Sequence, residues 1–211
     1  MNKIIPGILE TKWEDIEKKI ETAKILSKTI HIDIIDGVFA KNQTFLDPKP
    51  FSKYSNEIFF EAHFMVDNPL KFLEPFADAG FKRFLGHVEK MPDIAEFVAK
   101  GQLLGEVGLA LDIDTNPADL KINLEDLDCL LLMGVKAGES GQQMQTRVFG
   151  KLQALKSKTF IPIEIDGGIN DSNIVELQKM GADRFVSTSF LFSGNPLESF
   201  KKLVNLVDYS K

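Results

Sequence analysis

The sequence predicts a (β/α)8 barrel, in which eight parallel strands alternate with helices or loops. Short apolar runs typical of buried strands alternate with segments of helical periodicity along the whole chain. Eight such units in 211 residues fit a small barrel. A doubly wound open sheet is the alternative. No Gly-x-Gly-x-x-Gly motif follows the first strand, so a dinucleotide-binding version of that sheet is unsupported.

The eight expected strands are short, apolar and bounded by turn residues. The clearest is 29–35, because His31 and Asp33 alternate with isoleucines at the period of two that a strand imposes. An Asp-Gly pair at 36–37 supplies turn residues at its end. The strands are expected over residues 3–9, 29–35, 58–66, 83–87, 107–112, 128–133, 160–165 and 183–187.

Residues with capping chemistry mark the helices between these strands. Thr11 and Glu14 have the spacing of a capping box for a helix that begins near Lys12. Pro69 occupies the first turn of another helix, and Gly80 ends it. Residues 38–55 are expected to be mostly loop with a short helix. Further helices are expected over 92–101, from 116, and over 142–157, 171–180 (capped by Asn170 or Asp171) and 196–207.

The composition is that of an ordinary globular protein, and the whole chain, 1–211, is expected to form one domain. A net charge of −6 without a basic cluster argues against a nucleic-acid partner. No run approaches the roughly 20 apolar residues of a membrane span, and no leader pattern opens the chain. The single cysteine, Cys129, lies in an apolar run, which indicates a buried side chain and a reducing, cytoplasmic location.

Four side chains with metal-ligand chemistry lie where barrel enzymes form their active sites. His31 and Asp33 share one side of the second expected strand, His63 ends the third, and Asp166 closes the seventh. The C-terminal ends of barrel strands meet on one face, so we expect these four residues to converge. Two imidazoles and two carboxylates suit zinc, iron, manganese or cobalt. The alternative is a polar barrel interior joined by hydrogen bonds alone.

This set of residues suits proton transfer beside a carbonyl. A metal polarises a carbonyl and its neighbouring hydroxyl. Two carboxylates on opposite sides of a substrate can remove a proton from one face and return it to the other. The expected result is inversion of a carbon by way of an enediolate. A hydrolase that activates a metal-bound water is an alternative that the residues leave open.

Five motifs follow one another along nearly the whole chain. They are Ile-Pro-Gly-Ile-Leu at 5–9, His-Ile-Asp-Ile-Ile-Asp-Gly at 31–37, His-Phe-Met-Val-Asp-Asn-Pro at 63–69, His-Val-Glu at 87–89 and Asp-Gly-Gly-Ile-Asn at 166–170. As a set and in this order, they resemble the ribulose-phosphate 3-epimerase family. The resemblance implies a TIM barrel and a divalent metal held by His31, Asp33, His63 and Asp166. It also implies that Asp33 and Asp166 are the acid/base pair at C3 of a ketose phosphate.

The same resemblance implies a pocket for the phosphorylated sugar. Met65 and Met133 match methionines that lie beside the metal, and Gly7 matches a position that helps to place the substrate. Loop residues are expected to offer backbone N–H groups to phosphate, with glycine allowing close approach. These residues are Gly138, Gly141, Gln142, Gly167, Gly168, Thr188 and Ser189.

Several of these positions depart from the family's pattern. Gly7 replaces a serine, and Thr188-Ser189 replaces the usual Gly-Ser. In the loop after the sixth strand, Glu139 and Ser140 replace an aromatic residue and a glycine. A carboxylate near a phosphate weakens binding, although Lys136 can offset it. The residues expected to bind the metal and transfer protons therefore keep the family's pattern. The loops expected to bind the phosphate depart from it.

The resemblance predicts an epimerase of phosphorylated ketoses, with D-ribulose 5-phosphate to D-xylulose 5-phosphate as the expected reaction. The altered loops leave open a 3-epimerase of a hexulose 6-phosphate, and a non-catalytic metal-binding barrel is a third reading. Barrel relatives that decarboxylate orotidine or keto-gulonate phosphates use an Asp-x-Lys-x-x-Asp pattern, which His63-Phe64-Met65 replaces here. Members of the epimerase family commonly associate, so a homo-oligomer is expected.

Overall fold

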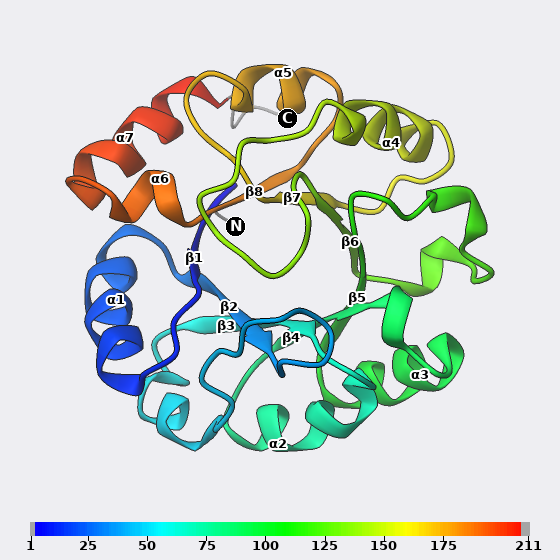
Figure 1. The fold of residues 1–211 in the computed structure, drawn as a ribbon, viewed down its shortest axis with the longest axis horizontal. Coiled ribbons are helices and arrows are strands. Elements are labelled where there is room, and N and C mark those ends of the chain that lie inside the picture. Colours follow the sequence, from blue (N-terminus) through cyan, green and yellow to red (C-terminus); the bar gives the residue numbers. More distant parts are fainter. Residues whose placement is uncertain (1–2, 208–211) are drawn as a thin grey trace.

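Eight parallel strands close into a barrel in the computed structural model, which describes residues 3–207 (Figure 1). Each strand pairs with its neighbours in chain order, and β8 pairs back with β1. The predicted (β/α)8 barrel is therefore confirmed, and the open sheet is excluded. The strands are β1 (Ile4–Ile8), β2 (Thr29–Ile35), β3 (Phe59–Met65), β4 (Arg83–His87), β5 (Glu106–Leu111), β6 (Cys129–Met133), β7 (Ile163–Asp166) and β8 (Arg184–Ser187).

Helices surround the barrel as an outer ring (Figure 1). Short 3₁₀ turns supplement them at Lys49–Tyr54, Pro69–Phe72, Val88–Lys90, Pro117–Asp119 and Leu124–Asp126. Within residues 3–207, no helix combines the length and the apolar character that a membrane crossing requires. The helices are α1 (Trp13–Leu26), α2 (Leu73–Asp78), α3 (Ile94–Leu104), α4 (Arg147–Lys156), α5 (Ile174–Lys179), α6 (Ser189–Phe192) and α7 (Pro196–Leu206).

Several predicted helix ends are wrong. Lys12, not Thr11, is the N-cap of α1, and its side chain makes no capping hydrogen bond. The N-cap of α5 is Asn173, and the side chain of Asn170 accepts a hydrogen bond from the backbone N–H of Ser172 in the turn before the helix. The helix expected from 116 is a single 3₁₀ turn.

The β6–α4 connection also differs from the prediction. α4 begins at Arg147, five residues later than the 142 expected. The intervening residues belong to a loop that lies over the barrel, where the backbone N–H of Gln145 donates to the carbonyl of Gly134. The short helix α6, directly after β8, is absent from the prediction. The late start of α4 and the presence of α6 depend on the path of the chain across the end of the barrel. The periodicity of the local sequence does not predict that path.

Successive side chains of a strand point alternately outward and inward, which divides the apolar core into an outer and an inner cluster. Outward residues such as Ile30 and Ile32 pack in a large cluster between strands and helices. Inward residues such as Met65 and Leu131 form a second cluster inside the barrel. Cys129 belongs to this inner cluster, and burial raises the pKa of its thiol to about 12. The prediction of a buried cysteine is confirmed.

Charged side chains also face the barrel interior. Arg83 is fully buried, and its guanidinium lies 2.5 Å from Glu61 and 2.6 Å from Glu106. On the opposite side of the barrel, Arg184 Nε lies 2.9 Å from Glu164 Oε2. Each buried carboxylate therefore has a cation beside it, which is the condition under which charge is tolerated in an interior.

We expect the substitution Arg83→Met to lower the free energy of unfolding by about 3–5 kcal/mol, because it leaves the buried charge of Glu61 without its cation. Equilibrium urea unfolding measures this change. Lys100→Met is the matched control, since it breaks an exposed ion pair with Glu96 and should change stability little. Equal effects of the two substitutions would contradict a stabilising role for the interior pair.

Candidate active site

Four of the predicted residues meet at the C-terminal end of the barrel. His31 and Asp33 on β2, His63 on β3 and Asp166 on β7 are all buried, and each offers one ligand atom within 4.8 Å of the others. The β2–β3 register places Asp33 directly beside His63. The convergence expected from the strand ends is therefore present.

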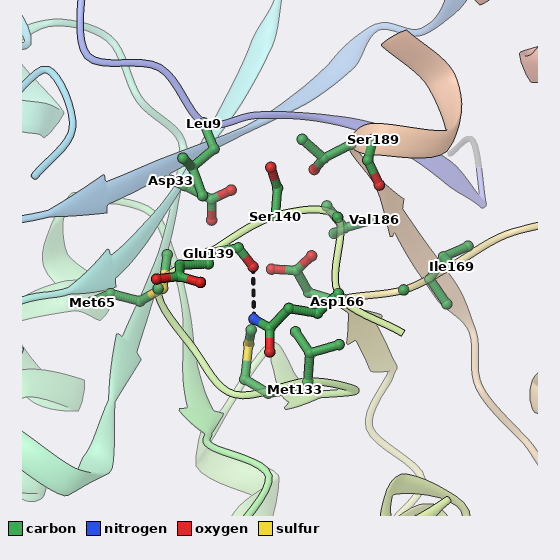
Figure 2. A pocket seen from close by; sticks show the side chains of 17 residues that line it. Leu9, Asp33, Met65, Met133, Glu139, Ser140, Asp166, Ile169, Val186 and Ser189 are labelled. Atoms are coloured by element: carbon green, nitrogen blue, oxygen red, sulfur yellow. Dashed lines mark hydrogen bonds between the residues drawn. The ribbon is translucent and has the colours of Figure 1, made fainter. Parts of the chain in front are cut away.

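Both imidazoles direct a nitrogen toward both carboxylates. His63 Nδ1 lies 2.9 Å from Asp33 Oδ1 and 3.4 Å from Asp166 Oδ2. His31 Nε2 lies 3.3 Å from Asp33 Oδ1 and 3.7 Å from Asp166 Oδ2. Figure 2 shows the carboxylates of Asp33 and Asp166 facing each other across the cavity. The four side chains thus surround one point from three strands.

Electrostatics within the cluster are dominated by the carboxylates. Burial lowers the pKa of His31, but the neighbouring carboxylates of Asp33, Glu164 and Glu61 outweigh burial, and the pKa is raised well above its usual value. Burial also lowers the pKa of His63, but Asp166 and Asp33 outweigh it, so this pKa is raised as well. Burial raises the pKa of Asp33, yet the two imidazoles hold it well below its usual range. The cluster therefore favours cations.

The donor set fits a divalent metal ion. His31 Nε2 is buried and makes no hydrogen bond of acceptable geometry, although Asp33 is 3.3 Å away. The other ring nitrogen, Nδ1, lies 2.7 Å from Glu61 Oε1. A buried nitrogen that points at two carboxylates while its ring is held from behind is the usual arrangement of a metal-binding histidine. Two imidazoles and two carboxylates suit zinc and its neighbours in the first transition row.

Most of the other predicted site residues line a cavity of about 30 Å³ above this cluster. Gly7 is the one predicted substrate residue that does not line the cavity. The predicted residues that do are Met65, Met133, Gly138, Gly141, Gln142, Gly167, Gly168, Thr188 and Ser189, together with Asp33 and Asp166.

The segment after β6 crosses the barrel end as a loop and closes the cavity (Figure 1). Gln142 Nε2 donates to the carbonyl oxygens of Lys136 and Glu139, at 2.8 and 2.9 Å. The backbone N–H of Ala137 donates to Asp112 Oδ1. Lys136 Nζ pairs with Asp112 at 2.6 Å, and Lys136 does not line this cavity, whereas Glu139 does.

The sequence analysis missed two acidic residues that contact or approach the cluster on the side away from the cavity. Glu61 lies two residues before His63, and Glu164 lies two residues before Asp166, each facing the barrel interior. The same period of two that placed His31 beside Asp33 would have found both. His87 stacks on His63 with ring centroids 5.0 Å apart, and its Nδ1 lies 2.7 Å from Glu89 Oε2.

Comparison with known sequences agrees with this geometry. A sequence model described as the ribulose-phosphate 3 epimerase family matches residues 3–192. The chain belongs to the ribulose-phosphate 3-epimerase family. It is 35% identical to a ribulose-phosphate 3-epimerase of Chlamydia pneumoniae over 90% of this chain and 86% of that protein. It is 31% identical to one of Aquifex aeolicus over 98% and 97%. The prediction of an isomerase of the epimerase class is confirmed.

Solved structures share the fold of this epimerase-family chain at much lower identity. The 3-hexulose-6-phosphate synthase of Salmonella typhimurium superposes with a TM-score of 0.71 at 13% identity, covering 97% of this chain and 98% of that one. Orotidine 5'-phosphate decarboxylase of Pyrococcus horikoshii gives 0.67 at 14% identity, covering 96% and 98%. Such low identities establish the barrel and nothing of the chemistry.

We expect Glu61→Gln to raise the dissociation constant for Zn²⁺ about 10–100-fold, because a neutral amide holds the His31 ring less firmly than a carboxylate does. Isothermal titration of the metal-free protein measures the change. The matched control is Glu57→Gln, an exposed position ahead of the same strand. An unchanged dissociation constant for Zn²⁺ in Glu61→Gln would show that metal binding by His31 does not need the Glu61 carboxylate.

We expect metal affinity to increase as the pH rises. The pKa values of His31 and His63 are raised above their usual range, so in the metal-free protein both imidazoles keep protons that a metal must displace. Titrations in buffers between about pH 6 and pH 8 should show tighter binding at the alkaline end, with proton release. A dissociation constant independent of pH would mean that both imidazoles are already neutral.

Proposed function

We propose that the protein interconverts D-ribulose 5-phosphate and D-xylulose 5-phosphate by epimerisation at C3, and that His31, Asp33, His63 and Asp166 bind a divalent metal. The observation that carries this proposal is the pair of buried carboxylates, Asp33 and Asp166, which face each other across one small cavity. The relatives named ribulose-phosphate 3-epimerase support the choice of substrate.

Inversion at C3 needs a base on one face of the carbon and an acid on the other. Asp33 projects from β2 and Asp166 from β7, so a ketose bound between them presents one face to each. One carboxylate removes the C3 proton, and the other returns a proton to the opposite face of the planar enediolate.

A bound divalent metal would supply polarisation of the C2 carbonyl and the C3 hydroxyl, which makes the C3 proton more acidic. The protein's own part is to hold the surrounding groups rigid. His31 and His63 are fully buried within strands, and Glu61 accepts a hydrogen bond from His31 on the side away from the cavity. Rigid strand positions limit the movement of catalytic groups between the two proton transfers.

We assign the phosphate to the part of the cavity between Gly167-Gly168 and Thr188-Ser189. Gly168 has φ +74°, and a Cβ there would lie 2.7 Å from the backbone nitrogen of Met144, so a side chain is excluded. Backbone N–H groups that point together in such turns bind anions without a charged side chain. Glu139 and Ser140, which line the same cavity, make a different phosphorylated ketose, such as a hexulose 6-phosphate, the second candidate.

The proposal is tested by measuring deuterium incorporation at C3 of the ketose phosphate. Metal-loaded protein is incubated with D-ribulose 5-phosphate in deuterated water, and the C3 signal is followed by NMR. The wild type should incorporate deuterium and form D-xylulose 5-phosphate. Asp33→Asn and Asp166→Asn should each lower the rate by about 10²–10⁴-fold, because each lacks one proton carrier. Asp119→Asn, an exposed carboxylate on the Pro117–Asp119 turn, is the matched control.

The metal content of every variant is measured by elemental analysis, so that lost metal is separated from lost proton transfer. Absence of exchange in wild type loaded with zinc, iron, manganese or cobalt would refute the pentose proposal. The experiment is then repeated with hexulose 6-phosphates. No exchange with these either, in protein that still binds metal, would leave the non-catalytic barrel.

A further inference from the structure

Gly7 on β1 and Thr188, the residue after β8, compete for one space at the rim of the cavity. A Cβ built on Gly7 would lie 2.2 Å from Thr188 Oγ1 and 2.8 Å from Val186 Cγ1. β1 and β8 are neighbours, and their register pairs Pro6 with Ser187, which brings the next two residues side by side. The side chain of Thr188 therefore occupies the volume that a side chain at position 7 would need.

The backbone itself does not require glycine at position 7. Gly7 lies inside β1 and is absent from the described glycines with positive φ. Glycine within a strand weakens it, and it commonly marks a place where another group approaches closely. Here the approaching group is the Thr188 hydroxyl, so the glycine serves to admit that side chain.

The Thr188 hydroxyl has no structural task of its own. Thr188 is the N-cap of α6, but its side chain makes no capping hydrogen bond. Across residues 3–207 the structure shows no hydrogen bond from its Oγ1. Thr188 is half-buried and lines the cavity that also contains Asp33 and Asp166. A hydroxyl that carries one donor and two acceptor positions is thus presented to whatever fills the cavity.

We infer that Thr188 is a specificity-determining residue whose side-chain hydroxyl hydrogen-bonds an oxygen of the bound phosphorylated ketose, and that Gly7 makes this possible by leaving the space empty. This inference rests on the proposed function. It assigns to the Thr188 side chain a role separate from that of the backbone N–H groups. It also gives Gly7 an indirect role, which explains why a predicted substrate residue does not line the cavity.

The hydroxyl is tested with Thr188→Val, which keeps the shape and removes the oxygen. KM for D-ribulose 5-phosphate should rise about 10-fold, as expected for one lost hydrogen bond, with a smaller change in kcat. Thr188→Ser, which retains a hydroxyl, should recover most of that loss. A KM for Thr188→Val equal to that of the wild type overturns the inference.

The shared space is tested by a double-mutant cycle read by thermal unfolding, which needs no activity. Gly7→Ala should lower Tm by several degrees in the wild type, because its methyl group meets Thr188 and Val186. In the Thr188→Gly background most of that loss should disappear. Gly150→Ala is the matched control, since a Cβ there meets nothing within 4 Å. An equal loss from Gly7→Ala in both backgrounds overturns the shared-space argument.

A final variant moves the hydroxyl from one strand to the other. Gly7→Ser combined with Thr188→Gly should have a lower KM than Thr188→Gly alone, because the serine oxygen enters the vacated space. A higher or equal KM counts against the inference. Wild type that neither binds nor converts any ketose phosphate overturns the proposed function and this hydroxyl role together. Active wild type with an unaffected Thr188→Val variant overturns the hydroxyl role alone.

Discussion

The contact between His31 and Glu61 is the interaction on which the site depends. Glu61 Oε1 lies 2.7 Å from His31 Nδ1, and Arg83 in turn lies 2.5 Å from Glu61 Oε2. This buried chain of opposite charges holds the imidazole so that Nε2 faces Asp33 and Asp166. Without the carboxylate, the ring could turn and pair either nitrogen with the aspartates. Without the guanidinium, the carboxylate would be a lone charge inside an apolar barrel, which is costly.

The two halves of the site are built from different parts of the fold. The residues proposed to bind the metal and to transfer protons project from β2, β3 and β7, where the pairing register of the strands sets their positions. The groups assigned to the phosphate lie on loops, where backbone conformation and glycine decide what fits. Loops tolerate change better than paired strands. The departures at Glu139, Ser140 and Thr188 fall on loops, as this difference predicts. Gly7 is an exception, because it lies within β1.

The barrel alone says little about the reaction. A 3-hexulose-6-phosphate synthase and an orotidine 5'-phosphate decarboxylase share this fold at 13% and 14% identity. The chemistry of this chain lies on its strand ends, where His63 stands beside Asp33, Asp166 and a second imidazole, that of His31.

The sequence by itself determined the eight strands, the inward direction of His31 and Asp33, and the convergence of four metal-ligand residues. These follow from a period of two and from turn residues, which act over a few neighbours along the chain. The tertiary structure alone decided the late start of α4, the partner of Lys136, the pairing of Glu61 with Arg83 and the contact between Gly7 and Thr188. Each of these joins residues that are distant in sequence, and closure of the barrel brings them into contact.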